Sequence, residues 1–258
     1  MDLALKGKKV LITGGSKGIG LACARAFMAE GARVAIVSRS RENLEQAKKT
    51  LGPVYTVAAD LINAAAAAAV VEQVEKEFGA IDVLVNSAGA AKRTNADDLT
   101  PAAWRAAMDA KYFTYINVID PLVKRMAARG SGVIVNIIGA GGKLASPIHL
   151  PGGSANAALM LATAGLANAY AAKGVRVVGI NPGLTNTSRV SEGLKADAKR
   201  EGISEDEALA RAVKKLPLGR LAEPGEIADI AVFAASARGR FLTGANISAD
   251  GVSTPTVV

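Results

Sequence analysis

The chain has 258 residues, half of them hydrophobic and only 4% aromatic, and it carries a formal net charge of +8. This length suits one large α/β unit, and a core of Ala, Val, Leu and Ile suits helices packed on a buried parallel sheet. The excess of positive charge raises the possibility of nucleic-acid binding, but the basic residues are scattered, with no Lys/Arg run and no interleaved aromatics. We therefore expect no nucleic-acid function.

The amino-terminal segment and the cysteine content indicate a cytoplasmic protein. MDLALKGKK contains no apolar signal core, and a single cysteine, Cys23, cannot form an intramolecular disulfide. Cys23 lies in an apolar helical pattern, where we expect a buried structural thiol. Residues 144–172 lack charged side chains, but they are Ala-rich and interrupted by Pro and Gly in their first third. We expect a buried helix there, with no membrane span.

Short apolar strands alternate with helical patterns along the chain, which is typical of repeated βαβ units. The predicted strands are 8–13, 33–38, 54–59, 81–86, 132–138, 175–180 and 245–250. The predicted helices are 18–30, 41–51, 62–78, 101–128, 154–173 and 224–237. Right-handed crossovers between them give a doubly wound, seven-stranded parallel sheet in a single Rossmann-type domain spanning 1–258. The polar segment 184–216 falls outside this alternation, as either a mobile lid over the substrate or a solvated surface excursion.

A glycine-rich turn, TGGSKGIG, follows the first predicted strand and opens the first helix. Glycines at these positions permit a tight turn, a close approach of pyrophosphate to the backbone, and packing of the helix on the strand. The helix N-terminus then offers free N–H groups to the anion. The expected cofactor contacts here are Gly14, Ser16, Lys17, Gly18, Ile19 and Gly20.

The end of the second predicted strand discriminates between the two nicotinamide cofactors. An NAD site of this architecture places an Asp or Glu there, whereas this chain has Ser38 and Arg39, with Lys17 in the glycine turn. Two cations beside the ribose favour a 2′-phosphate. NADP(H) is therefore predicted in preference to NAD(H), unless Arg39 is an ordinary surface cation.

Further motifs occur in a fixed order along the chain: AAD (58–60), NSAG (86–89), INPGLTNT (180–187), PLGRLAEPGEIADIAVFAAS (217–236) and FLTGANISADG (241–251). Together with TGxxxGxG, this series resembles the short-chain dehydrogenase/reductase family, and in particular its 3-oxoacyl-acyl-carrier-protein-reductase-like branch. The resemblance implies hydride transfer between NAD(P)H and a carbonyl or alcohol carbon. It also implies further cofactor contacts at Asp60, Leu61, Asn86, Ala88, Gly89, Pro182, Gly183, Leu184 and Thr187.

The catalytic tetrad that the resemblance implies is substituted at all four positions. The family's asparagine falls on Lys111, its serine on Gly139, its tyrosine on Gly152 and its lysine on Asn156. The following segment, NAALMLATAGLA, supports this register because it is similar to the family's K-A-A-L pattern. A positioned general acid contributes about 10²–10⁴-fold, so ordinary carbonyl reduction is in doubt.

Few groups are available to replace the missing acid. His149, the single histidine, precedes the tyrosine position by three residues, and Lys111 itself carries a proton. The structural alternatives are a loop histidine at a pocket mouth and a lysine that bonds the adjoining backbone. Ser154 is first of all a candidate helix N-cap, and Lys143 lies at the edge of the predicted pocket.

Three functions therefore remain open. The first is an oxidoreductase with a rebuilt proton relay, the second a catalytically inactive NADP(H)-binding sensor or partner subunit, and the third a non-redox enzyme on the same scaffold. No metal site is predicted. The uncharged helix 154–173 and the long helix 101–128 resemble the family's pairing surfaces, so we expect a homodimer or homotetramer. An unidentified small molecule is the expected substrate.

Overall fold

Seven parallel strands form one sheet in the computed structural model, which describes residues 2–89 and 91–256. Their order across the sheet is β3-β2-β1-β4-β5-β6-β7. The sequence thus predicted the fold class correctly. The bounds are β1 (Lys9–Thr13), β2 (Arg33–Ser38), β3 (Tyr55–Ala58), β4 (Val83–Asn86), β5 (Gly132–Ile137), β6 (Val175–Pro182) and β7 (Asn246–Ala249).

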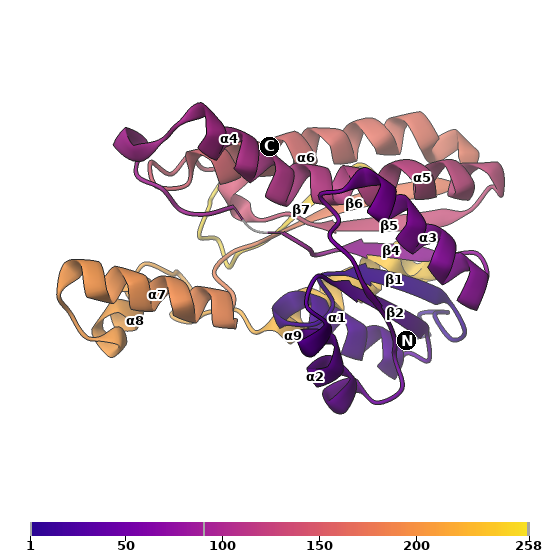
Figure 1. The fold of residues 1–258 in the computed structure, drawn as a ribbon, viewed down its shortest axis with the longest axis horizontal. Coiled ribbons are helices and arrows are strands. Elements are labelled where there is room, and N and C mark those ends of the chain that lie inside the picture. The colour runs from indigo at the N-terminus through magenta and orange to yellow at the C-terminus, as the bar shows by residue number, and fades with distance from the viewer. Residues whose placement is uncertain (1, 90, 257–258) are drawn as a thin grey trace.

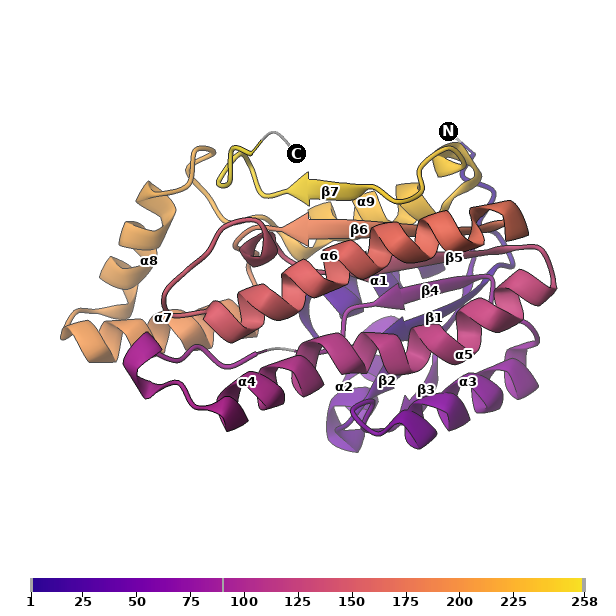
Figure 2. The same ribbon diagram turned by 90° about the horizontal axis from the view of Figure 1, so that it is seen from above.

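Helices cover both faces of the sheet (Figures 1 and 2). One face is covered by α1 (Gly18–Ala29), α2 (Arg41–Leu51) and α9 (Pro224–Ala235), which share one apolar cluster with the strands. The other face is covered by α3 (Ala64–Phe78), α5 (Thr114–Ala128) and α6 (Leu150–Tyr170), which form the second cluster. The apolar runs of the strands are buried between these two layers, as a parallel sheet requires.

Two further helices, α7 (Ser188–Glu201) and α8 (Glu205–Lys214), project beyond the carboxyl ends of the strands (Figures 1 and 2). They account for most of the segment 184–216. No helix among the described residues is both long and apolar enough to cross a membrane.

The predicted helix 101–128 is one continuous helical run with an irregular centre. It consists of α4 (Pro101–Ala107), a π-helical stretch η2 (Met108–Phe113) and α5. The π-helical stretch widens the backbone in the middle of the run, and such insertions occur frequently at functional sites. Lys111 lies within it.

Helix α6 begins at Leu150, four residues before the predicted start at 154, so the predicted break at 151–153 was wrong, whereas residues 144–149, which include Pro147, are not helical. Pro151 fits the first turn because the N–H that proline lacks has no helical partner there. Ser154 consequently lies inside the helix, where its hydroxyl donates to the carbonyl of Leu150 at 3.0 Å. The predicted N-cap role of Ser154 is therefore also wrong.

The single cysteine matches its prediction. Cys23 is fully buried on α1, and burial raises the pKa of its thiol to about 12. A thiol that stays protonated and has no access to solvent is a packing residue.

Candidate active site

The order of the strands locates a crevice before any side chain is considered. Strand β1 has β2 on one side and β4 on the other, so the connections leaving β1 and β4 diverge at their carboxyl ends. Ligands of doubly wound sheets bind at this switch point. β1 ends at Thr13 and β4 ends at Asn86, which are paired in register.

The glycine turn has the geometry that a phosphate-binding loop needs. Gly14 and Gly18 have φ values of +67° and +53°, which residues with a Cβ rarely adopt. A Cβ on Gly20 would overlap the carbonyl oxygen of Gly14, so only glycine allows the helix to start here. α1 begins at Gly18 without a side-chain cap, which leaves its first N–H groups open to an anion. These features fit the pyrophosphate of a dinucleotide.

The end of β2 presents cations and no carboxylate. Arg39 and Lys17 are both exposed, and neither forms an ion pair with another residue in the described part of the chain. The hydroxyl of Ser40 accepts the N–H of Asn43 and so caps α2. Asp60, after β3, is exposed, whereas Leu61 beside it is buried.

A line of buried polar side chains, which the sequence did not predict as a unit, crosses the sheet from the switch point. Thr13 donates to Asn86 at 3.2 Å, and Asn86 donates to Asn136 at 3.1 Å. Asn136 then donates to Thr163 on α6 at 3.0 Å. The backbone N–H groups of Ser87 and Ala88 also donate to the Thr13 hydroxyl. Satisfied buried networks are rigid, so this line fixes the strand ends beneath the site.

Gly89 brings the loop after β4 against the π-helical stretch. Its φ is +98°, and a Cβ there would overlap the carbonyl oxygen of Ala110. The guanidinium of Arg189, in the first turn of α7, donates to the Gly89 carbonyl at 3.3 Å. Three segments that are far apart in the sequence therefore meet next to Lys111.

The Lys111 ammonium is buried and has only neutral partners among the described residues. It donates to the carbonyl of Ile137 at 3.1 Å and to the hydroxyl of Tyr115 at 2.9 Å, and Tyr115 in turn donates to Ile137. Burial, and secondarily the charge of Arg189, lower the pKa of Lys111 to about 7. The expected backbone contact exists, but it is made to the end of β5.

Gly139 and Asn156, predicted to replace the family's serine and lysine, face one another. Gly139 follows β5 with a φ of +127°, and a Cβ there would lie 3.2 Å from the Asn156 amide nitrogen. Asn156 itself is buried on α6. A residue with a side chain at 139 would be strained in this backbone conformation.

The imidazole of His149 occupies the space next to Gly152. A Cβ on Gly152 would overlap Cε1 of the ring and lie 2.8 Å from Nδ1. Nδ1 is buried without a hydrogen-bond partner in the described structure. Burial lowers the pKa of His149, and the charges of Arg93 and Lys111 lower it further. The His149 ring thus fills the space into which a side chain at residue 152 would extend.

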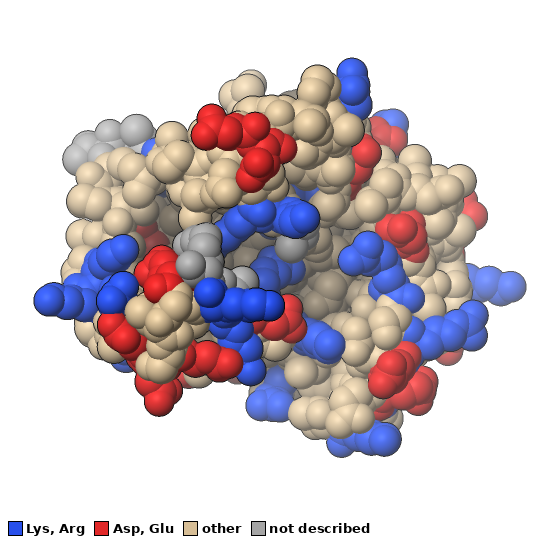
Figure 3. Space-filling view, turned by 60° about the vertical axis from the view of Figure 1, so that its left-hand side comes forward, with Lys and Arg blue, Asp and Glu red and all other residues tan. Residues whose placement is uncertain are grey.

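Cations from several elements surround the hollow at the carboxyl edge of the sheet. Figure 3 shows Lys and Arg side chains gathered around this hollow, on the side toward which α7 and α8 project. The Thr94 N–H donates to the Ile148 carbonyl at 3.1 Å, so the segment carrying Arg93 runs beside the residue that precedes His149. Sequence reasoning missed Arg93 and Arg189, which lie in loops and helix ends without a motif. Lys143, predicted at the pocket edge, donates to Ser248 at 3.1 Å.

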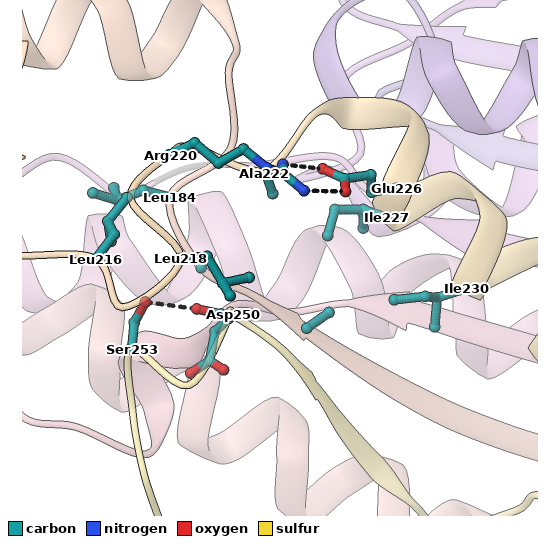
Figure 4. Close-up of a pocket in the computed structure, with 13 residues that line it drawn as sticks. Leu184, Leu216, Leu218, Arg220, Ala222, Glu226, Ile227, Ile230, Asp250 and Ser253 are labelled. Carbon is teal, nitrogen blue, oxygen red and sulfur yellow. Dashed lines mark hydrogen bonds and ion pairs between the residues drawn. The ribbon is translucent and has the colours of Figure 1, made fainter. Parts of the chain in front are cut away.

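A separate cavity of about 170 Å³ lies at the base of the segment 184–216 (Figure 4). Leu184 and Leu216, at the two ends of this segment, both line it. Arg220 forms a bidentate ion pair with Glu226 at its rim, with both contacts at 2.7 Å. Gly183, in the predicted cofactor loop, packs against Asp250 on the same cavity wall. The cavity is mostly apolar and contains neither His149 nor Lys111.

Comparisons with known proteins agree with this architecture. The family model for short chain dehydrogenases matches residues 8–198, so the chain belongs to that family. A 3alpha-hydroxysteroid dehydrogenase from Mediterraneibacter gnavus is 31% identical, over 98% of this chain and 99% of the relative.

Two further relatives are similar to the same degree. A 3-oxoacyl-acyl-carrier-protein reductase from Chlamydia muridarum is 31% identical, over 97% of this chain and 99% of its own. The crystal structure of L-sorbose reductase from Gluconobacter frateurii, complexed with NADPH and L-sorbose, has a TM-score of 0.93 at 31% identity and full coverage of both chains. Proteins named for a steroid, an acyl-carrier protein and a sugar are thus equally similar to this chain, and the similarity selects no substrate.

Proposed function

We propose that this chain is an NADP(H)-dependent oxidoreductase for a carbonyl or alcohol group, with a proton relay rebuilt around His149. The glycine turn and the open start of α1 fit the pyrophosphate, and the NADPH-bound state of the L-sorbose reductase structure supports the same cofactor class. Arg39 and Lys17 favour the 2′-phosphate. NADPH, when bound, supplies the hydride for reduction.

The observation that carries the relay is the seating of the His149 ring against Gly152. We place Lys111, Gly139, Gly152 and Asn156 in the four tetrad positions of the family. The backbone of Gly139 and the packing of Gly152 both disfavour the ordinary family residues. The substitutions therefore form one rearranged site, and they are not separate losses.

His149 is assigned the proton transfer. A pKa below its ordinary value leaves the imidazole neutral at pH 7, so at that pH it accepts a proton from an alcohol undergoing oxidation. In the reductive direction it donates a proton once the pH falls toward that pKa. Nδ1 is enclosed, so Nε2 makes the exchange. The Lys111 ammonium, held by the carbonyl of Ile137, is the positive charge beside the developing alkoxide.

The test combines cofactor titration with turnover. NADPH fluorescence on binding gives the dissociation constant, and NADPH oxidation or NADP⁺ reduction is followed over a panel of ketones and secondary alcohols. We expect His149→Ala to lower kcat by about 10²–10⁴-fold with the NADPH dissociation constant unchanged. Full activity in both His149→Ala and Lys111→Met would refute the rebuilt relay. Tight NADPH binding without turnover would instead indicate an inactive binding protein, and turnover without a nicotinamide change a non-redox enzyme.

We further propose that α7 and α8 act as the substrate lid and that the chain is a homo-oligomer in the cytoplasm. The lid assignment rests on the projection of both helices beyond the strand ends (Figure 2). The proposal of an oligomer rests on an exposed apolar side chain, because Leu161 on the predicted pairing helix α6 is 76% exposed and would be covered by a partner subunit. Light scattering on the full chain gives the mass, and a monomer would contradict the second proposal.

A further inference from the structure

The hollow in front of His149 collects cationic side chains from three separate parts of the chain. Lys111 comes from the π-helical stretch, Arg189 from the first turn of α7 and Arg93 from the loop after β4, and all three converge on His149, which directly precedes α6. The Arg189–Gly89 hydrogen bond and the Thr94–Ile148 hydrogen bond hold these parts together. The convergence is therefore built by the fold and does not depend on flexible surface side chains alone.

Only part of this positive charge is paired with a carboxylate in the described part of the chain. Among the described residues, the acceptors of Lys111 and Arg189 are carbonyl and hydroxyl oxygens, at 2.9–3.3 Å. Arg93 contacts Asp197 at 3.6 Å, and its own side chain remains 52% exposed. The charge of Arg189 lowers the pKa of Lys111, and the charges of Arg93 and Lys111 lower the pKa of His149, so these cations disfavour further positive charge in the hollow. A bound anion would relieve this repulsion.

The cofactor's own phosphates do not account for all of these cations. The pyrophosphate-binding turn lies at Gly18, whose Cβ position is 3.2 Å from the Thr187 side chain. Arg189 is two residues from Thr187 and could reach that phosphate. Arg93 is held beside His149, on the side of the site where the reacting carbon must lie if His149 is the proton donor.

We propose that the substrate is a ketone or secondary alcohol that carries an anionic group, a carboxylate or a phosphate, bound by Arg93 and Arg189 beside Lys111. Guanidinium groups bind both anions through paired hydrogen bonds. The net charge of +8 also attracts such a substrate over longer distances. The assignment of a carbonyl or alcohol group rests on the proposed function, whereas the assignment of an anionic group rests on these cations alone.

Binding measurements separate the two proposals. Calorimetry on the full chain, with and without NADPH, compares oxocarboxylates of four to ten carbons with their methyl esters, and ketose phosphates with the free ketoses. We expect at least one acid or phosphate to bind about tenfold or more tightly than its neutral counterpart. The acid and phosphate arms identify which anion the site prefers. If no charged member exceeds its neutral counterpart by that factor, the inference is wrong, even when NADPH oxidation supports the proposed function.

Variants of single arginines show which side chain binds the anionic group of the substrate. Arg93→Gln should remove the preference for the charged ligand by about tenfold or more while leaving NADPH affinity unchanged. Arg25→Gln, an equal loss of charge on the exposed face of α1, is the matched control and should change neither quantity. Loss of NADPH affinity in Arg93→Gln, with the preference retained, would assign this arginine to the cofactor and overturn the inference. Arg189→Gln shows by the same two readouts whether that residue serves the substrate or the pyrophosphate.

Discussion

The packing of His149 against Gly152 predicts that Gly152→Ala lowers stability when His149 is present and raises it when His149 is replaced by alanine. Gly152→Ala adds a methyl group that would overlap Cε1 of the imidazole, so the ring must move. Overpacking of this kind costs about 1–3 kcal/mol. Alanine also stabilises a helix by about 0.5–1 kcal/mol relative to glycine. Gly152→Ala should therefore destabilise the wild-type chain by up to about 2.5 kcal/mol as the difference of these two terms.

With His149→Ala as background, the space beside residue 152 is empty and only the helix effect remains. There Gly152→Ala should stabilise the chain by about 0.5–1 kcal/mol. Urea unfolding of the wild type, both single variants and the double variant gives the coupling energy, which we expect at about 1–3 kcal/mol. Gly165→Ala, on the same helix with nothing within 4 Å of the added methyl, is the control and should stabilise both backgrounds equally. Equal effects of Gly152→Ala in the two backgrounds would refute the seating of the ring.

Three further predictions concern the rest of the site. Gly139→Ser should lower the unfolding free energy by about 1–3 kcal/mol because φ is +127°, without restoring activity; a stable, more active variant would contradict this. Between about pH 7 and pH 10.5, Lys111 is protonated in the unfolded chain but deprotonated in the folded chain. The unfolding free energy of the wild type should therefore rise with pH across that window, relative to that of Lys111→Met. Parallel stability–pH curves for the two would show that Lys111 is not buried. Arg39→Gln should weaken NADPH binding by about 10–100-fold and leave NADH binding unchanged, with Arg25→Gln as the control. Equal NADPH affinities of Arg39→Gln and the wild type would contradict a contact between Arg39 and the 2′-phosphate.

Periodicity was sufficient to predict the sheet from the sequence. The strand at 33–38 and the helix at 41–51 have the bounds that were predicted, and the other strands differ by at most two residues at either end. Buried parallel strands are continuous apolar runs, which composition alone reveals. The start of α6 was missed because a Pro-Gly-Gly sequence ordinarily ends a helix. Here the glycines are required by close packing, against His149 at 152 and against the carbonyl oxygen of Gly141 at 153.

Sequence reasoning anticipates the backbone of the candidate site where a local motif determines it, and it misses the side chains that tertiary contacts place there. The glycine turn is local, so its positive φ values could be expected from the sequence. The π-helical geometry around Lys111 and the placement of Arg93 depend on contacts between distant segments, for which one sequence carries no signal. In the register predicted from the sequence, lysine falls on the family's asparagine position at 111 and asparagine on its lysine position at 156, so the two residue types are exchanged. The structure adds that both residues are buried.

The two ends of the projecting segment meet at a single point. The N–H of Ala222 donates to the carbonyl of Leu184 at 3.0 Å, and the N–H of Asn186 donates to the carbonyl of Ala222 at 2.8 Å. Because the chain leaves and returns at one backbone pair, doubling the length between them would cost only about 0.6 kcal/mol in closure entropy. Evolution can therefore lengthen, shorten or exchange residues 190–221, which follow the expected cofactor contact Thr187, as a cassette while the sheet and the nucleotide turn stay unchanged. In such a scaffold the choice of substrate can diverge separately from the binding of the cofactor.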